Sequence, residues 1–316
     1  MVNEISLVSL RGGLGNQLFQ LAFLLSRRKA GRLFIEPWFF NDEDSPPGQC
    51  GLWQFSLPDR VSFIERKPIC HRLWSRIDSY MLRAGSKIKI SRNINLFAIE
   101  AIGSFIASIA YRTRFRVAVA SGNGYDSRID TKRKSNYFIG FFQSFNWVMN
   151  NEVKLELGSI KPKGESVELA KYIELARKVK PLVIHLRLGD YLLDDNRGIP
   201  DLKYYESAIT WQNHKTEFNE IWIFSDDIDM AKKKLNNLPQ SSIKWFQNIN
   251  NSDAETFELM RHGHAFVIGN STFSWWAAYL SYSKNPEVVA PEPWFKSSPN
   301  PVSLLPRHWK KMDPGY

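Results

Sequence analysis

The chain has 316 residues, of which 43% are hydrophobic and 14% aromatic, and this composition excludes an intrinsically disordered protein and allows two hydrophobic cores. Its two cysteines, Cys50 and Cys70, belong to no CxxC or His/Cys pattern, so we expect neither a disulfide framework nor a zinc site. No signal peptide and no run of about 18 apolar residues is evident, so we expect a cytoplasmic protein without a membrane span.

The net charge of +10 is concentrated in one segment. Residues 59–134 hold 16 Lys and Arg against 6 Asp and Glu, whereas the rest of the chain holds 26 of each kind. Within this segment residues 96–110 are mostly apolar and precede Arg112, Arg114 and Arg116, which fits a helix lying on an anionic membrane surface or a buried helix with a solvated basic flank. No nucleic-acid-binding module surrounds these residues, so nucleic acid is not an expected partner.

The chain opens with a β-loop-α-β pattern, the minimal unit of a doubly wound parallel sheet. Ile5 to Leu10 predicts a strand, residues 16–30 predict a helix that ends at Gly31, and residues 32–36 predict a second strand. Farther along, residues 137–142 are aromatic and β-branched, which predicts another strand.

Residues 160–164 contain a proline and a glycine and are the expected linker between a domain of residues 1–164 and a domain of residues 165–316. The second half then alternates strands and helices, which predicts an α/β fold with a parallel sheet covered on both faces. Ser252 and Glu255 have the spacing of a capping box. The predicted strands are 182–187, 221–225, 243–246 and 265–269, and the predicted helices are 165–178, 203–213, 229–236, 253–262 and 272–283.

A glycine-rich turn follows the first strand. Ligands of open parallel sheets bind beyond the carboxyl ends of the strands, so Gly13, Gly15, Asn16 and Gln17 are candidates to face a small polar ligand. Leu18 stands where a dinucleotide-binding fingerprint has its third glycine, which disfavours a dehydrogenase. The alternative is a purely structural turn in which Asn16 caps the helix.

A histidine and an arginine interrupt the apolar strand that opens the second half. His185 and Arg187 point to the same side of this strand, and a fixed guanidinium matches a phosphate whose charge grows as it leaves. The alternatives are an ion pair between Arg187 and Asp190 that holds the turn, and a buried structural His185. Asp190 and His185 are also the candidates for a general base that would accept a proton from an attacking hydroxyl group.

The turn that follows the strand at 265–269 is rich in hydroxyl groups and begins a helix. Free N–H groups at a helix start, together with hydroxyl side chains, suit the phosphates of a nucleotide. Plain capping of the helix by a serine is the alternative. The candidate residues are Asn270, Ser271, Thr272 and Ser274.

Acidic residues follow the strand at 221–225. Asp226 and Asp227 are candidates to accept hydrogen bonds from a nucleotide base or ribose, with Asp229 capping the next helix. The competing interpretation is that Asp227 and Asp229 form an Asp-x-Asp pattern that holds a divalent metal across two phosphates. A cation at Arg187 makes a metal less necessary, and no metal is expected.

Taken together, these segments resemble the bacterial α-1,2-fucosyltransferases. The likeness covers nearly the whole chain in the order of the family and is weakest between residues 60 and 130. One departure stands out, because Leu188 occupies the place where the family usually has a second arginine. The matching segments are residues 12–20, 137–144, 185–191, 204–206, 224–227 and 270–277.

The resemblance implies an enzyme of the GT-B type, with two Rossmann-like domains facing a central cleft. It implies transfer of fucose from GDP-β-L-fucose to the 2-hydroxyl of a sugar, such as galactose in an O-antigen glycan, with inversion and without a metal or other cofactor. Two alternatives remain: another nucleotide-sugar glycosyltransferase on the same scaffold, and a non-catalytic carbohydrate-binding protein.

The resemblance also assigns roles to the candidate residues. Arg187 would neutralise the β-phosphate of the departing GDP, and Asp226 or Asp227, with residues 270–274, would hold the nucleotide. Asn16 and its glycine turn would face fucose and the acceptor. A lipid-linked acceptor would give the basic segment 59–134 a reason to contact an anionic membrane.

Overall fold

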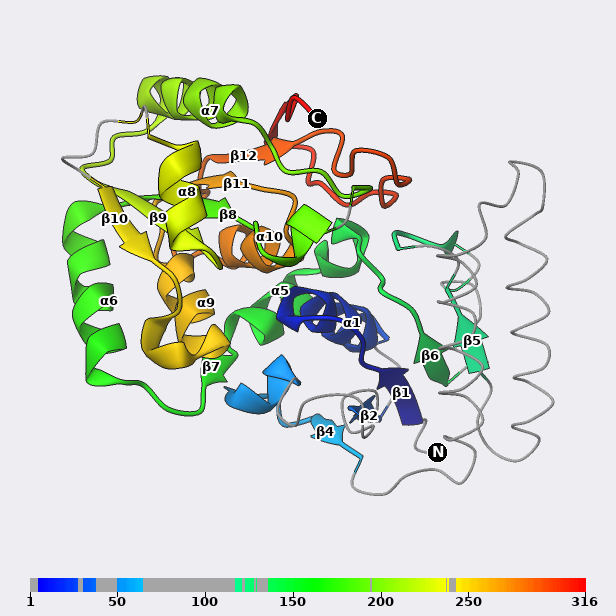
Figure 1. Ribbon diagram of the computed structural model, residues 1–316. Helices are drawn as coiled ribbons and strands as arrows, with labels where there is room; N and C mark the ends of the chain where they lie inside the picture. The colour runs from blue at the N-terminus through cyan, green and yellow to red at the C-terminus, as the bar shows by residue number, and fades with distance from the viewer. Residues whose placement is uncertain are drawn as a thin grey trace.

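Two parallel β-sheets carry the fold (Figure 1). The first sheet has the strand order β4-β2-β1-β6-β5 and the second the order β10-β9-β8-β11-β12-β13. A short antiparallel pair, β3 with β7, accompanies them. The structure, a computed structural model, describes residues 5–27, 31–37, 50–64, 117–120, 123–127, 129, 136–193, 195–236, 238 and 243–316.

The first sheet is built entirely from strands that precede residue 140. Alternate residues of its strands, such as Val8, Ile35 and Phe138, are buried in the same core as helix α1 (Leu14–Ser26). The strands are β1 (Ile5–Ser9), β2 (Arg32–Glu36), β4 (Val61–Phe63), β5 (Val117–Val119) and β6 (Tyr137–Ile139). The predicted strands at 5–10 and 32–36 are confirmed, and the strand predicted at 137–142 is shorter than expected.

Helix α1 differs from its prediction at both ends. It begins at Leu14 and ends at Ser26, so the predicted end at Gly31 is wrong. Arg27 leaves the helical conformation with φ −80° and ψ 65°, and its guanidinium lies 4.8 Å from the centroid of the Phe138 ring. A cation–π contact with the sheet therefore takes the place of the predicted basic last turn.

The second sheet confirms the predicted alternation of strands and helices between residues 165 and 283, while its last two strands, which follow that range, were not predicted. Its strands are β8 (Leu182–Leu186), β9 (Ile221–Ser225), β10 (Ile243–Phe246), β11 (Ala265–Ile268), β12 (Val288–Pro291) and β13 (Lys310–Met312). Its helices are α6 (Val167–Val179), α7 (Leu202–Lys215), α8 (Ile228–Lys234), α9 (Asp253–Arg261) and α10 (Thr272–Tyr279). Alternate strand residues pack with α7 and α8 on one face and with α6, α9 and α10 on the other.

Several shorter elements join these layers. Helix α5 (Asn151–Gly158) and the pair of β3 (Phe55–Ser56) with β7 (Lys161–Pro162) were not predicted from the sequence. The segment expected to be a linker therefore contains a strand that is paired with the first half of the chain. The described 3-10 helices are η2 (Gly51–Gln54), η3 (Phe145–Val148), η4 (Asp190–Leu193) and η6 (Ile249–Asn251).

Only half of the predicted capping box forms. The Ser252 hydroxyl accepts a hydrogen bond from the Glu255 N–H at 3.3 Å, as expected. The Glu255 carboxylate instead accepts from the N–H and the hydroxyl of Ser166, which is the N-cap residue of α6. Glu255 therefore joins the starts of two helices rather than closing the box on its own helix.

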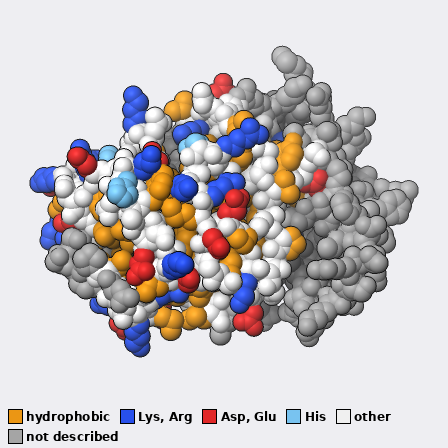
Figure 2. All heavy atoms as spheres, turned by 90° about the horizontal axis from the view of Figure 1, so that it is seen from above, with side chains coloured by type: hydrophobic (Ala, Val, Ile, Leu, Met, Phe, Trp, Pro, Cys, Tyr) orange, Lys and Arg blue, Asp and Glu red, His pale blue; other side chains and the backbone are white. Residues whose placement is uncertain are grey.

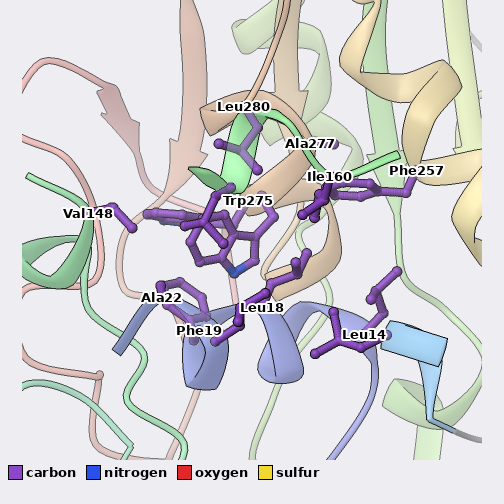
Figure 3. Packing of buried hydrophobic residues seen from close by; sticks show 14 of the residues in the cluster. Leu14, Leu18, Phe19, Ala22, Val148, Ile160, Phe257, Trp275, Ala277 and Leu280 are labelled. Atoms are coloured by element: carbon purple, nitrogen blue, oxygen red, sulfur yellow. The ribbon is translucent and has the colours of Figure 1, made fainter. Parts of the chain in front are cut away.

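The two halves share one continuous hydrophobic core, in which α1 packs against α10 (Figure 1). Figure 3 shows Leu18 and Phe19 of α1 turned toward Trp275 of α10. The ring centroids of Phe19 and Trp275 are 4.7 Å apart. Two residues near the end of the chain reach back to the first half, because the carbonyls of Val302 and Ser303 accept the N–H groups of Tyr125 and Phe145.

Most of the basic segment 59–134, including the apolar stretch 96–110, lies outside the described residues. On the described part of the face seen in Figure 2, Lys and Arg side chains are interspersed with Asp and Glu. This pattern agrees with the equal numbers of basic and acidic residues outside that segment. Among the residues described, no helix combines the length and the apolar character that crossing a bilayer requires.

Candidate functional site

A pocket of about 200 Å³ lies where the carboxyl ends of strands β1, β8, β9 and β11 meet the starts of α1, α9 and α10. It combines residues from both halves of the chain, as expected for a site between two parallel sheets. Its lining residues are Gly13, Leu14, Gly15, Asn16, His185, Arg187, Tyr191, Arg197, Phe224, Ser225, Asp226, Gln247, Asn248, Asp253, Thr256, Met260, Ser271, Thr272 and Phe273.

The first half contributes the start of α1, which touches the start of α10. A Cβ atom on Gly15 would lie 2.4 Å from the carbonyl carbon of Thr272 and 2.5 Å from the amide nitrogen of Phe273, so only glycine permits this approach. The Asn16 side-chain oxygen accepts hydrogen bonds from Gln143 at 2.8 Å and from the Thr272 hydroxyl at 3.3 Å. Two helix N-termini therefore meet at the pocket, and each carries a partial positive charge.

Gln17, predicted to face the ligand, does not line the pocket. Its side chain is fully buried, donates to the carbonyl of Gly12 at 2.9 Å and accepts from the N–H of Leu52 at 3.1 Å. The glutamine thus fixes the glycine turn and the η2 segment, while Gly13, Gly15 and Asn16 form the pocket wall.

Arg187 was predicted to lie in the strand, but it follows the end of β8, and 40% of its side chain is exposed. Its Nε is 3.3 Å from a carboxylate oxygen of Asp226. The two oxygens of Asp226 also accept the N–H groups of Leu188 at 2.8 Å and Gly189 at 3.1 Å. Asp226 therefore holds both the turn and the guanidinium, which indicates a positioning role beside the predicted contact with the nucleotide.

His185 is neutral in the folded protein at physiological pH. Burial, and secondarily the positive charge of Arg187, lowers the pKa of its imidazole to about 3. Its side chain is buried, its Nδ1 has no hydrogen-bond partner among the described residues, and its ring lies 6.0 Å from that of Phe273. An imidazole with so low a pKa is a poor proton acceptor near pH 7, which weakens His185 as a general base.

Of the four phosphate-binding candidates predicted at the start of α10, only two line the pocket. Ser271 and Thr272 line it together with Phe273. Ser274 is fully buried, donates to the carbonyl of Ser271 and does not line the pocket. Asn270 donates to two backbone carbonyls of the neighbouring loop at 3.0 Å each, which is a structural role.

Two predicted acidic residues take other places. Asp227 is the N-cap of α8 and accepts the N–H of Met230 at 2.9 Å, so the cap expected at Asp229 is formed by Asp227 instead. The side chain of Asp190 lies outside the described residues, and its part in an ion pair or in proton transfer stays a prediction.

Five polar residues of the pocket wall were not singled out in the sequence: Arg197, Gln247, Asn248, Asp253 and Thr256. Gln247 and Asn248 follow β10, and Asp253 begins α9, so the alternation of strands and helices placed them at the ligand-binding edge. Arg197 lies between η4 and α7 and carries no local motif. Within the described residues, no three His, Cys, Asp or Glu side chains converge to hold a metal ion.

Comparison of the sequence with known proteins identifies a glycosyltransferase family and two full-length relatives. The sequence profile of glycosyl transferase family 11 matches residues 124–298, more than half of the chain. An alpha-1,2-colitosyltransferase of Escherichia coli is 25% identical over 98% of this chain and 99% of its own length. The O-antigen biosynthesis glycosyltransferase WbnK of Escherichia coli is also 25% identical, over 95% of this chain and 98% of its own length.

The solved structure of E. coli ADP-heptose lps heptosyltransferase II is similar in fold. It superimposes with a TM-score of 0.51 and 11% sequence identity, covering 98% of this chain and 90% of the heptosyltransferase. The predicted α/β fold of the GT-B type, with two Rossmann-like halves facing a cleft, is confirmed.

Proposed function

This chain belongs to glycosyl transferase family 11 and is a glycosyltransferase, and on that premise we propose that it transfers fucose from GDP-β-L-fucose to the 2-hydroxyl of a galactose unit, with inversion. The acceptor in this proposal is a surface glycan such as an O-antigen unit, assembled on a lipid carrier. The relative WbnK, named for O-antigen biosynthesis, supports this choice of acceptor.

One observation carries the proposal: Arg187 and the starts of α1 and α10 line the same pocket. A diphosphate leaving group needs a cation and free N–H donors where its charge develops, and this pocket supplies both. The neutral sugar then binds beside Gly13 and Gly15 at the start of α1, where the absence of side chains leaves space.

In this proposal the base of the nucleotide binds polar residues from another part of the pocket wall. Asp253 and Asn248 lie on the segment that joins β10 to α9, at the pocket. Guanine presents an N1–H and an exocyclic amine, two adjacent donors that a carboxylate accepts, whereas adenine presents a donor and an acceptor. We therefore assign a guanosine nucleotide to this wall.

The transfer itself requires positioning and leaving-group stabilisation more than a strong base. The acceptor hydroxyl attacks the anomeric carbon from the side opposite the phosphate, and the bond to the β-phosphate oxygen breaks with its electron pair. Arg187 stabilises the charge that appears on that oxygen, and Asp226 keeps the guanidinium in place. Asp190 is the base candidate that remains, since the low pKa of His185 makes it a poor one.

A second candidate donor is GDP-colitose, because one full-length relative is named an alpha-1,2-colitosyltransferase. Colitose lacks the 3-hydroxyl of fucose, so a site that hydrogen-bonds that hydroxyl would reject colitose, while an apolar site would accept both sugars. A metal-free reaction is part of the proposal, and EDTA is expected to leave the rate unchanged. Loss of activity with EDTA would favour a metal at Asp227 and Asp229.

The deciding experiment is product analysis with the purified protein. GDP-fucose and GDP-colitose are each incubated with a set of β-galactosides, and the linkage of the product is determined by NMR. The proposal expects an α-linked fucose on the 2-oxygen of galactose. Transfer of colitose alone would replace the donor, while a β-linkage or attachment to another oxygen would contradict the proposed mechanism.

A further inference from the structure

Arg197 is a second cation in the pocket, and no sequence motif pointed to it. It lies in the segment between η4 and α7, beyond the turn that carries Arg187. Its guanidinium carbon is 4.8 Å from the centroid of the Tyr191 ring, and Tyr191 is 91% buried. Stacking on a buried ring restricts a guanidinium to one plane and orientation.

Arg197 and Tyr191 both form hydrogen bonds with Asn270, the residue before the N-cap Ser271 of helix α10. The Asn270 side chain donates to the carbonyl of Arg197 at 3.0 Å, and the backbone N–H of Lys296 donates to the same carbonyl at 3.1 Å. The Tyr191 hydroxyl donates to the carbonyl of Asn270 at 3.1 Å. These bonds hold the stacked pair beside the start of α10, where Ser271 and Thr272 line the pocket.

The balance of positive and negative side chains in the pocket lining favours a second phosphate-binding cation. Leu188 is 99% buried in the core of the second half, so the place of the family's second arginine carries no charge here. Arg187 is paired with Asp226, and Asp253 adds another negative charge to the described lining. With Arg197 the arginines balance the two aspartates, and without it the described lining would be net negative and would repel a diphosphate.

We propose that Arg197, stacked on Tyr191, is the second phosphate-binding cation of this enzyme and takes over the role of the arginine that is absent at position 188. The proposal rests on the proposed function, because it requires a nucleoside diphosphate as the leaving group. As the bond between the anomeric carbon and the β-phosphate oxygen breaks, the electron pair stays on that oxygen. The acceptor oxygen bonds to the anomeric carbon and releases its proton to the base, for which Asp190 is the candidate, and Arg197 stabilises the new phosphate charge. Tyr191 is a positioning residue.

The test compares binding of GDP and GMP by titration calorimetry for the wild type, Arg197→Ala and Arg307→Ala. Arg307 is exposed and does not line the pocket, so it is the matched control. We expect Arg197→Ala to weaken GDP binding by roughly 10- to 100-fold, as for loss of a charge-assisted hydrogen bond, with GMP binding changed by less than about 3-fold. Arg307→Ala should bind both nucleotides as the wild type does.

Two further variants keep the test decisive if Arg197→Ala folds poorly. Arg197→Lys keeps the charge without the planar fork, and Arg197→Gln keeps polar volume without the charge, so GDP affinity should fall in the order wild type, Lys, Gln. Tyr191→Leu, which removes the stacking ring, should weaken GDP more than Tyr191→Phe, which keeps it. Equal loss of GDP and GMP affinity in the Arg197 variants would show a structural role only and overturn the inference.

The outcomes separate this inference from the proposed function. If the Arg197 variants bind GDP as tightly as the wild type while GDP-fucose is still transferred, the inference fails and the function stands. If the wild type does not bind GDP but binds another nucleoside diphosphate in an Arg197-dependent way, the proposed donor is wrong and the role of Arg197 as the second cation is supported. Equal affinity of the wild type for the diphosphate and monophosphate of every nucleoside tested would contradict both.

Discussion

The two strand-to-turn segments at the pocket edge differ in chemistry although they occupy equivalent places in their sheets. The turn after β1 contributes Gly13, Gly15 and Asn16, which are uncharged and allow close approach of backbone. The turn after β8 contributes Arg187, which Asp226 holds from the neighbouring strand. Under the proposed function, this difference assigns the charged diphosphate to the turn of the second half, whereas the turn of the first half is assigned to the neutral sugar and packs against α10.

Removing the cation of the second turn should have the largest effect. Arg187→Ala is expected to lower kcat/KM for GDP-fucose by about 100- to 1,000-fold, because the leaving diphosphate loses a fixed charge-stabilising donor. Arg187→Lys should fall between that variant and the wild type, since the charge remains but the fork does not. Steady-state kinetics measures both, and a change below about 3-fold in Arg187→Ala would show that the two turns do not divide the chemistry in this way.

A matched pair of glycine variants tests the close contact between the turn after β1 and helix α10. Gly15→Ala places a Cβ against the backbone of Thr272 and should cost about 1–3 kcal/mol in the free energy of unfolding and lower the activity, because α1 and α10 must separate. At Gly13 an added Cβ meets nothing within 4 Å, so Gly13→Ala should cost no more than about 1 kcal/mol, as a lost N-cap preference. Urea unfolding compares the two, and equal losses would contradict the close contact at Gly15.

Variants of the adjacent residues Asp226 and Asp227 test whether the carboxylate that holds Arg187 matters for the reaction. Asp226→Asn removes the charge that holds Arg187 and should lower kcat by roughly 10-fold, about the effect of one lost charge-assisted hydrogen bond. Asp227→Asn replaces one good helix cap with another and should change kcat and stability only slightly. Kinetics of both variants gives the answer, and equal kinetic losses would contradict the distinct roles of the two carboxylates.

The smallest effect concerns His185 and pH. Its pKa is about 3 in the folded protein and near 6.5 in the unfolded chain, so the unfolded state binds more protons between these values. The wild type should therefore lose unfolding free energy as pH falls through this window. Between pH 7.5 and 5.0 we expect the wild type to lose about 1–2 kcal/mol more than His185→Gln. Urea unfolding at both pH values tests this, and an identical pH dependence would mean that His185 is not buried neutral.

The strands β8 to β11 and the helices of the second half could be predicted, because these strands are short, largely apolar runs and each helix has a polar residue at its start. Strands β12 and β13 were not predicted, and β13 consists of two lysines and a methionine without an apolar pattern. The first half was harder, since the end of α1 depends on the contact of Arg27 with Phe138, which no local pattern shows. The β3–β7 pair likewise joins segments that are distant in sequence. Local reasoning found the residues that begin or end an element at the pocket, such as Arg187 and Thr272.

Partners that come from elsewhere in the chain could not be found in this way. Asp226 was identified as a site residue, but its bonds to the turn at 187–189 join two neighbouring strands and are visible only in three dimensions. Arg197 follows no strand and belongs to no motif, and its place depends on Tyr191 and Asn270. Gln17 and Ser274 had the right chemistry but point into the interior, because helical spacing turns them away from the pocket.

The most direct test of the central claim is a crystal structure of the protein with GDP bound. The account predicts that the β-phosphate lies within hydrogen-bond distance of the Arg187 guanidinium and of the N–H groups at the start of α10, between Ser271 and Phe273. A diphosphate bound against the glycine turn of α1 instead, with no contact between Arg187 and a phosphate, would contradict it.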